Sequence, residues 1–135
     1  MNDRQILLIK KSWHQFLLNA EENEVLFFNR LFEMAPEVKQ LFKGNLKELT
    51  KKFTSITTFM VSKLHNFEDA LKEVKTIIQR NNQYKLSAEY YAFMGDALLC
   101  TLENGLAETW NDELKESWAT AYFALADSMV RSEAE

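Results

Sequence analysis

Apolar side chains recur at spacings of three and four residues along almost the whole chain, which is the period of an amphipathic α-helix. No stretch gives a convincing strand pattern. The stripes comprise, in chain order, Ile6, Ile9, Trp13, Phe16 and Leu17; Val25, Phe28, Leu31, Phe32 and Met34; Leu46, Leu49, Phe53, Ile56, Met60 and Leu64; Phe67, Leu71, Val74 and Ile78; Tyr91, Met94, Leu98 and Leu102; and Leu114, Trp118, Tyr122, Leu125 and Met129.

Polar residues and one proline mark where the stripes begin and end. We expect Asp3 to cap the first helix, a polar break at 19–23, and Pro36 to end the second helix and start a short one toward Leu41 and Phe42. Later starts are expected at Asn45 with Glu48, Asn66 with Asp69, Ser87, and Thr109, Asn111 or Asp112. The pattern predicts an all-α class with about seven helices in one globular domain, residues 1–135.

Composition supports a packed helical domain and excludes several other classes. The 135 residues are 47% hydrophobic, whereas Gly 3 and Pro 1 leave little material for the tight turns of a β fold. The single cysteine, Cys100, excludes an internal disulfide framework and Cys-rich zinc sites. With a net charge of −4 and no basic cluster, the sequence predicts no nucleic-acid binding. No apolar run could span a membrane, and the N-terminus is not typical of a signal peptide, so we expect a cytoplasmic protein.

A run of amides follows the fourth long stripe, in the segment VKTIIQRNNQY at 74–84. The run contains Gln79, Asn81, Asn82 and Gln83 around Arg80. Asn is a middling helix former that favours caps and turns, so this segment is expected to end an amphipathic helix. What Asn81 faces decides the functional interpretation.

The order of landmarks resembles the globin family, in particular bacterial single-domain globins and the globin part of flavohemoglobins. The resemblance extends from KKSW at Lys10 to the end of the last helix. Its most specific stretch is FFNRLFEMAPEVKQLF, 27–42, which is similar to the family's second helix and proline corner. LLCTLENGLAETW and LKESWATAYFALADSM are similar to its last two helices. The resemblance implies a globin fold around a heme pocket.

Carried over by position, the resemblance places six residues at a remnant heme pocket. These are Phe28, Phe42, Leu49, Phe53, Asn81 and Tyr91. Phe42 matches the phenylalanine that packs on heme. Phe28 falls where many bacterial globins have a tyrosine that binds oxygen, Leu49 falls at the distal His or Gln position, and Phe53 falls at the next inward position. Asn81 falls where the family has its iron-ligating histidine, and an amide oxygen is a poor ligand for heme iron.

Other side chains are weaker candidates for an iron ligand. His14 and His65, the only histidines, do not match the ligand position and are interpreted as surface or boundary residues. Lys52 is interpreted as solvent-facing, and Tyr84 and Tyr91 as hydrogen-bonded tyrosines, although tyrosinate is a known heme ligand. We interpret Cys100, Met60 and Met94 as core residues. No metal site or catalytic residue is predicted.

The favoured hypothesis is a heme-free globin-fold protein with a sensory or protein-interaction role. It rests on Asn81 together with the apolar residues Phe28 and Leu49. A homodimer through the last two helices, or an unidentified protein partner, goes with this hypothesis. The alternative is a heme protein with weak or unusual iron ligation that binds oxygen or another diatomic gas, with heme as its cofactor. An enzyme is not predicted, because these residues include no flavin reductase domain and no nucleophile–base pair.

Overall fold

A computed structural model describes residues 2–37, 39, 46–80 and 88–134. Over these residues it contains six α-helices and two short 3₁₀ helices, and no strand is found among them. The helices are α1 (Asp3–Leu17), α2 (Ala20–Met34), α4 (Leu46–Ser62), α5 (Phe67–Arg80), α6 (Ala88–Leu106) and α7 (Asp112–Ala134), and the 3₁₀ helices are η1 (Leu64–Asn66) and η2 (Ala107–Thr109). The predicted all-α class is confirmed.

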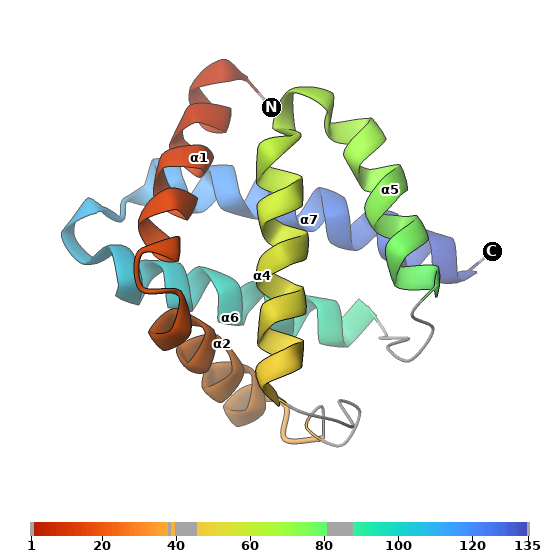
Figure 1. Cartoon of the computed structure of the whole chain (residues 1–135), viewed down its shortest axis with the longest axis horizontal. Helices are drawn as coiled ribbons and strands as arrows, with labels where there is room; N and C mark the ends of the chain where they lie inside the picture. The colour runs from red at the N-terminus through yellow and green to blue at the C-terminus, as the bar shows by residue number, and fades with distance from the viewer. Residues whose placement is uncertain (1, 38, 40–45, 81–87, 135) are drawn as a thin grey trace.

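The helices pack across one another rather than side by side in a parallel bundle. In Figure 1, α4 passes in front of α6 and α7, with α1 on one side of it and α5 on the other. Helix α2 packs on α6, and α6 packs on α7. Helix α5 contacts α4, η1 and α7. Helix α4 therefore contacts α1, α2 and α5, and α7 contacts α1, α5 and α6.

The starts of α1 and α2 differ from the sequence prediction. Asn2, rather than Asp3, caps α1, because its side chain accepts a hydrogen bond from the Gln5 amide and the Gln5 side chain accepts one from the Asn2 amide. The expected break at 19–23 is wrong beyond Asn19, since α2 begins at Ala20. Within it, buried Asn23 donates to the Phe16 carbonyl at 2.9 Å, which ties α2 to the end of α1.

Other predicted boundaries agree with the structure or lie outside the described residues. Of the three starts proposed for the last helix, Asn111 is the capping residue, because its Oδ1 accepts from the Leu114 amide at 2.9 Å. Leu64 was expected on the long α4 stripe but lies in η1, after α4 has ended at Ser62. The proposed starts at Asn45 and Ser87, and the short helix toward Phe42, fall outside the described residues.

The buried apolar residues form two clusters. The larger cluster joins α1, α2, α6 and α7, and it also includes one residue from α4, one from η1 and one that directly follows α2. Its buried members are Ile6, Ile9, Trp13, Phe16, Phe27, Phe28, Leu31, Ala35, Val61, Leu64, Ala97, Leu98, Leu102, Leu106, Trp118 and Ala121. The smaller cluster lies between α4, α5, α6 and α7 and comprises Met60, Ala70, Val74, Tyr91 and Ala126. Met94, Phe67 and Tyr122 pack against both clusters.

Two tryptophans anchor the larger cluster with both their rings and their N–H groups. Trp13 stacks on Phe16 with ring centroids 4.4 Å apart, and it lies 5.7 Å from the Trp118 ring. Its Nε1 donates to Thr58 Oγ1 on α4, and Trp118 Nε1 donates to Ser12 Oγ on α1. Because buried indole N–H groups need partners, these two bonds fix α1 against α4 and α7.

Within the described residues, no helix is both long enough and apolar enough to cross a membrane.

Candidate functional site

Phe28 lies in the core on the inner face of α2. Its exposed fraction is 3%, and that of its neighbour Phe27 is 0%. The two rings meet edge to face with centroids 4.9 Å apart, and Phe28 also lies 5.8 Å from the Phe32 ring. The position that the resemblance assigns to an oxygen-binding tyrosine is therefore held by a phenyl ring packed among other phenyl rings, and a phenyl ring has no hydrogen-bond donor.

Phe53 on α4 meets this group through Phe27. The two rings are stacked, with centroids 4.2 Å apart and an angle of 13° between their planes. Offset stacking of aromatic rings stabilises a contact beyond the area that it buries. The structure thus brings Phe28 and Phe53 together at the crossing of α2 and α4, with Phe27 between them.

Phe27 was not singled out from the sequence. It is the fully buried ring that joins Phe28 to Phe53, and the interpretation of α2 had given Val25 an inward position instead. Val25 is 54% exposed. The sequence spacing could have indicated that Phe27 faces inward. Asn23, Phe27 and Leu31 are spaced by four residues, share one face of the helix and are all buried.

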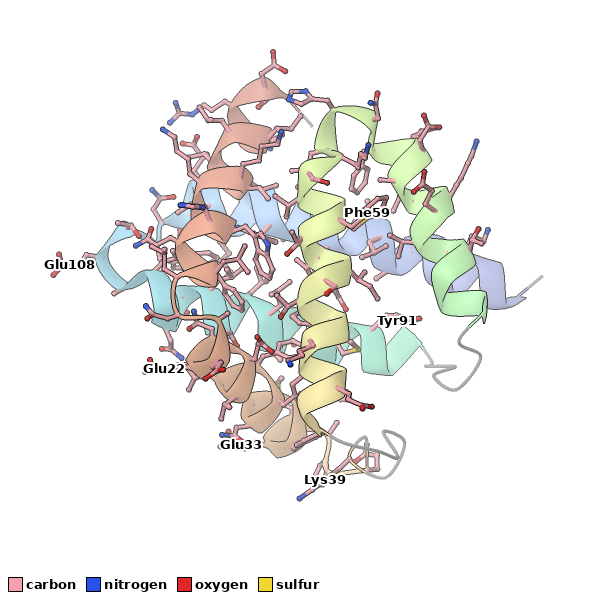
Figure 2. The ribbon with its side chains drawn as sticks, viewed as in Figure 1. Glu22, Glu33, Lys39, Phe59, Tyr91 and Glu108 are labelled. Atoms are coloured by element: carbon pink, nitrogen blue, oxygen red, sulfur yellow. The ribbon has the colours of Figure 1, made fainter. Side chains whose placement is uncertain are left out.

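Tyr91 packs in the smaller cluster with an exposed fraction of 8%. Figure 2 shows it near the start of α6, and shows Phe59 between α4 and α5. The Tyr91 carbonyl accepts a hydrogen bond from the Tyr122 hydroxyl at 2.6 Å. The structure therefore does not bring Tyr91 into the aromatic group of Phe28 and Phe53; Met94 and Tyr122 lie between the two clusters.

The Tyr122 ring lies directly over α6 at Gly95. A Cβ atom at Gly95 would meet Tyr122 Cε1 at 2.6 Å, closer than such contacts normally occur. Burial, together with the nearby Tyr91 and Asp96, raises the pKa of Tyr122 above its usual value of 10.0. The hydroxyl therefore stays protonated at neutral pH and acts as a donor that fastens α7 to α6.

The remaining predicted pocket residues cannot be placed by their side chains. Phe42 and Asn81 lie outside the described residues. Leu49 is part of α4, and α4 also carries Lys52, but neither side chain is among those described. Asn81 in the ligand position thus stays a prediction from the sequence.

Both histidines of the chain are on the surface. His14 is exposed near the end of α1, and His65 is exposed in η1. Among the described residues no group of three or more His, Cys, Asp or Glu side chains could hold a metal ion. Met60 is buried, and Met94 and Cys100 are half-buried, as expected for core residues. Tyr84 lies outside the described part of the chain.

The side chains that could bind the heme implied by the resemblance are few. Heme iron in this fold is held by an imidazole, and no imidazole of this chain is buried. The Trp13, Trp118 and Tyr122 donors are already bonded to protein oxygens. One buried hydroxyl in the described residues, Thr54 on α4, has no hydrogen-bond partner, and a hydroxyl of this kind is not a heme ligand. The described residues do not fit a heme bound through histidine.

Comparison with known proteins finds one family for most of the chain. The family model named Globin matches residues 25–129. A leghemoglobin of Canavalia lineata is 23% identical over 141 aligned positions, which cover 97% of this chain and 95% of that protein. An anaerobic nitrite reductase of Gossypium hirsutum is 28% identical over 135 positions, covering 89% of this chain and 83% of that protein.

A flavohemoprotein of Bordetella pertussis is 28% identical over 110 residues. The matched part is 79% of this chain and 27% of the flavohemoprotein, so the chain spans little more than a quarter of that relative's length. These matches confirm the resemblance stated from the sequence.

Proposed function

This chain belongs to the globin family, and we propose that it is a member without histidine-bound heme that serves a sensory or protein-interaction role. The globin fold then provides a helical scaffold and a recognition surface rather than an oxygen site. This role goes beyond family membership, because one fold hosts unrelated functions and the site has to carry the argument.

The exposure of both histidines is the observation that carries the proposal. His14 and His65 are the only imidazoles in the chain, and both lie on the surface, on α1 and in η1. The iron–imidazole bond anchors the macrocycle in a heme globin. A chain with no imidazole in its interior has no side chain of the usual kind to make that bond.

The distal side supports the same proposal. A pocket for bound oxygen supplies a hydrogen-bond donor above the iron, and the buried rings of Phe28 and Phe53 have none. The change on the distal side and the amide at Asn81 on the proximal side are independent features of the sequence. The first removes the hydrogen-bond donor for bound oxygen, and the second removes the histidine ligand of the iron.

A heme protein with unusual ligation is the second candidate. The globin match and the relatives called leghemoglobin and flavohemoprotein favour it at the level of the family. Apolar contacts alone contribute much of the affinity for a macrocycle, and the buried Tyr91 provides a phenol of a type that ligates heme iron. This candidate requires a tyrosinate or an amide to replace the imidazole.

Enzymatic activity is not part of the proposal. Most globins are not enzymes, and the reductase named in the Gossypium hirsutum relative describes that protein. The described residues include no cluster of His, Cys, Asp or Glu that could hold a catalytic metal. A cytoplasmic location likewise stays a prediction.

An absorption spectrum of the purified protein, recorded before and during titration with hemin, tests the proposal. We expect no Soret band before addition, and added hemin should behave as it does free in the same buffer. A sharp Soret band that saturates at one hemin per chain would contradict the proposal. Tyr91→Phe is then the variant to compare, because loss of the band in that variant identifies tyrosinate as the ligand.

The interaction role is proposed to use a second copy of the chain, joined through α6 and α7. The supporting observation is Phe123 on α7, a large aromatic side chain that is 47% exposed. Aromatic residues of this kind are enriched at the centres of protein interfaces. Light scattering after gel filtration should give a dimer for the wild type and a monomer for Phe123→Ser. Leu18→Ser, at a residue 70% exposed at the end of α1, is the control and should stay dimeric. A monomeric wild type would contradict this part.

A further inference from the structure

We infer that the aromatic rings at the crossing of α2 and α4 occupy part of the space that heme takes in a globin, so that this chain excludes heme by packing as well as by its missing ligand. The inference rests on the proposed function and adds a second, separable cause to it. It predicts that returning a histidine to position 81 does not by itself make a heme globin.

The ring packing is the first step of the argument. Phe27 is fully buried, and its ring meets Phe53 on one side in a stacked pair and Phe28 at an angle of 90°. Phe28 keeps only 3% of its surface exposed. If Phe28 lined an open cavity large enough for a macrocycle, part of its ring would be accessible from that cavity. Neighbouring protein atoms cover Phe28 instead, whereas Phe53 is half-buried.

The position of these rings is the second step. By resemblance, Phe28 falls at the position of the oxygen-binding tyrosine, Leu49 at the distal position, and Phe53 at the next inward position on α4. The structure joins Phe28 and Phe53 through Phe27 into a single group that belongs to the larger cluster. Interiors pack as densely as organic crystals, so a volume filled by rings is not available to another large apolar group.

The cost of displacing the rings is the third step. Room for a macrocycle at this crossing requires Phe53 to leave its stacked position on Phe27, 4.2 Å away. Because Phe27 is held from the other side by Phe28, the whole group would have to repack. This steric obstacle is independent of the residue at position 81, which lies after the end of α5 at Arg80.

The test is a hemin titration of four proteins, followed by the Soret band and by quenching of tryptophan fluorescence. They are the wild type, Asn81→His, Asn81→His with Phe53→Ala, and Asn81→His with Leu18→Ala. The last protein is the control, because it also loses a large apolar side chain, but from a residue at the end of α1 that is 70% exposed and that the proposed dimer does not use. Circular dichroism establishes that each variant is folded. If Phe53→Ala does not fold, Phe53→Leu removes the stacked ring while keeping an apolar side chain and takes its place.

The expected order of hemin affinities follows from the two obstacles. The wild type should not bind hemin, and Asn81→His should bind it weakly. Adding Phe53→Ala to Asn81→His should tighten binding by about tenfold or more, whereas adding Leu18→Ala should leave it unchanged. The inference is overturned if Asn81→His alone binds one hemin per chain as tightly as the double variant, or if the double variant gains nothing.

These outcomes separate the inference from the proposed function. A wild type that binds hemin tightly would contradict the proposed function. A wild type that does not bind hemin, combined with an Asn81→His variant that binds it tightly, would leave the proposed function standing and refute only the steric obstacle.

Discussion

The larger and the smaller core clusters are held together by different kinds of contact. In the larger cluster, rings stack on rings, as in Trp13 with Phe16 and Phe27 with Phe53, and both indole N–H groups are bonded to side chains of other helices. The smaller cluster contains mainly aliphatic side chains around Tyr91, and partly buried residues complete it. The two clusters meet at Met94, Phe67 and Tyr122.

The difference concerns which helices carry most of the described core. Helix α5 belongs to the smaller cluster, and the amide run with Asn81 follows it in the sequence. Most of the buried residues of the described part of the chain lie in the larger cluster, on α1, α2, α6 and α7.

The largest expected effect comes from the stacked rings of the larger cluster. Phe27→Ala should lower the free energy of unfolding by about 3–5 kcal/mol, because it leaves a cavity beside Phe28 and Phe53. Val74→Ala, at a fully buried residue of the smaller cluster, removes a smaller side chain and should cost about 2 kcal/mol. Denaturant unfolding of both variants, with Leu18→Ala at an exposed residue as the control, measures the two costs. A cost for Phe27→Ala below that of Val74→Ala would show that the Phe27 ring is not packed against Phe28 and Phe53.

The junction between the clusters should tolerate no added volume at Gly95. Gly95→Ala places a methyl group against the Tyr122 ring and should cost about 1–3 kcal/mol through overpacking. Replacing the ring with a smaller side chain, as in Tyr122→Leu, should relieve the clash. The cost of the double variant should therefore be smaller than the sum of the two single costs. Additive costs in thermal or denaturant unfolding would show that the ring does not press on this helix.

The smallest effect concerns the hydroxyl of Tyr122. Tyr122→Phe removes the bond to the Tyr91 carbonyl and should cost about 1 kcal/mol at neutral pH. The pKa of Tyr122 is raised in the folded state, so the contribution of this group to stability is complete below the unfolded value of 10.0 and falls as pH rises above it. Unfolding measured from about pH 8 to pH 11 should therefore show a shallower alkaline loss for Tyr122→Phe than for the wild type. Identical alkaline slopes would argue against a buried, bonded hydroxyl.

Much of the fold could be predicted from the sequence, because helical spacing directly encodes which residues face inward. The stripes placed Ile6, Ile9, Trp13 and Phe16 correctly in the core, and Asn111 was among the proposed starts of α7. The errors arose where two residues compete for a local role. Asn2 and Asp3 are both good caps, and the hydrogen bond with Gln5 decides between them. Residues 20–23 are helical because Ala20, Glu21 and Glu22 are good helix formers and the bond from Asn23 to the Phe16 carbonyl holds the first turn of α2.

Less of the candidate site could be predicted. Alignment with a family assigns positions, and it pointed to Phe28 and Phe53, but it does not show how rings pack against one another. The packing of Phe28 and Phe53 depends on Phe27, whose side chain has no chemistry that distinguishes it in a sequence. Likewise, nothing in the spacing of Gly95, Tyr91 and Tyr122 indicates that a ring on α7 covers a glycine on α6, because that contact is set by the helix crossing.

Native mass spectrometry of the full chain, purified from cells supplied with heme, is the most direct test of the central claim. The account predicts the mass of the polypeptide, 15.8 kDa, or twice that mass for the proposed dimer, with no heme adduct. A spectrum dominated by one heme per chain would contradict the account and would identify the protein as a heme-binding globin.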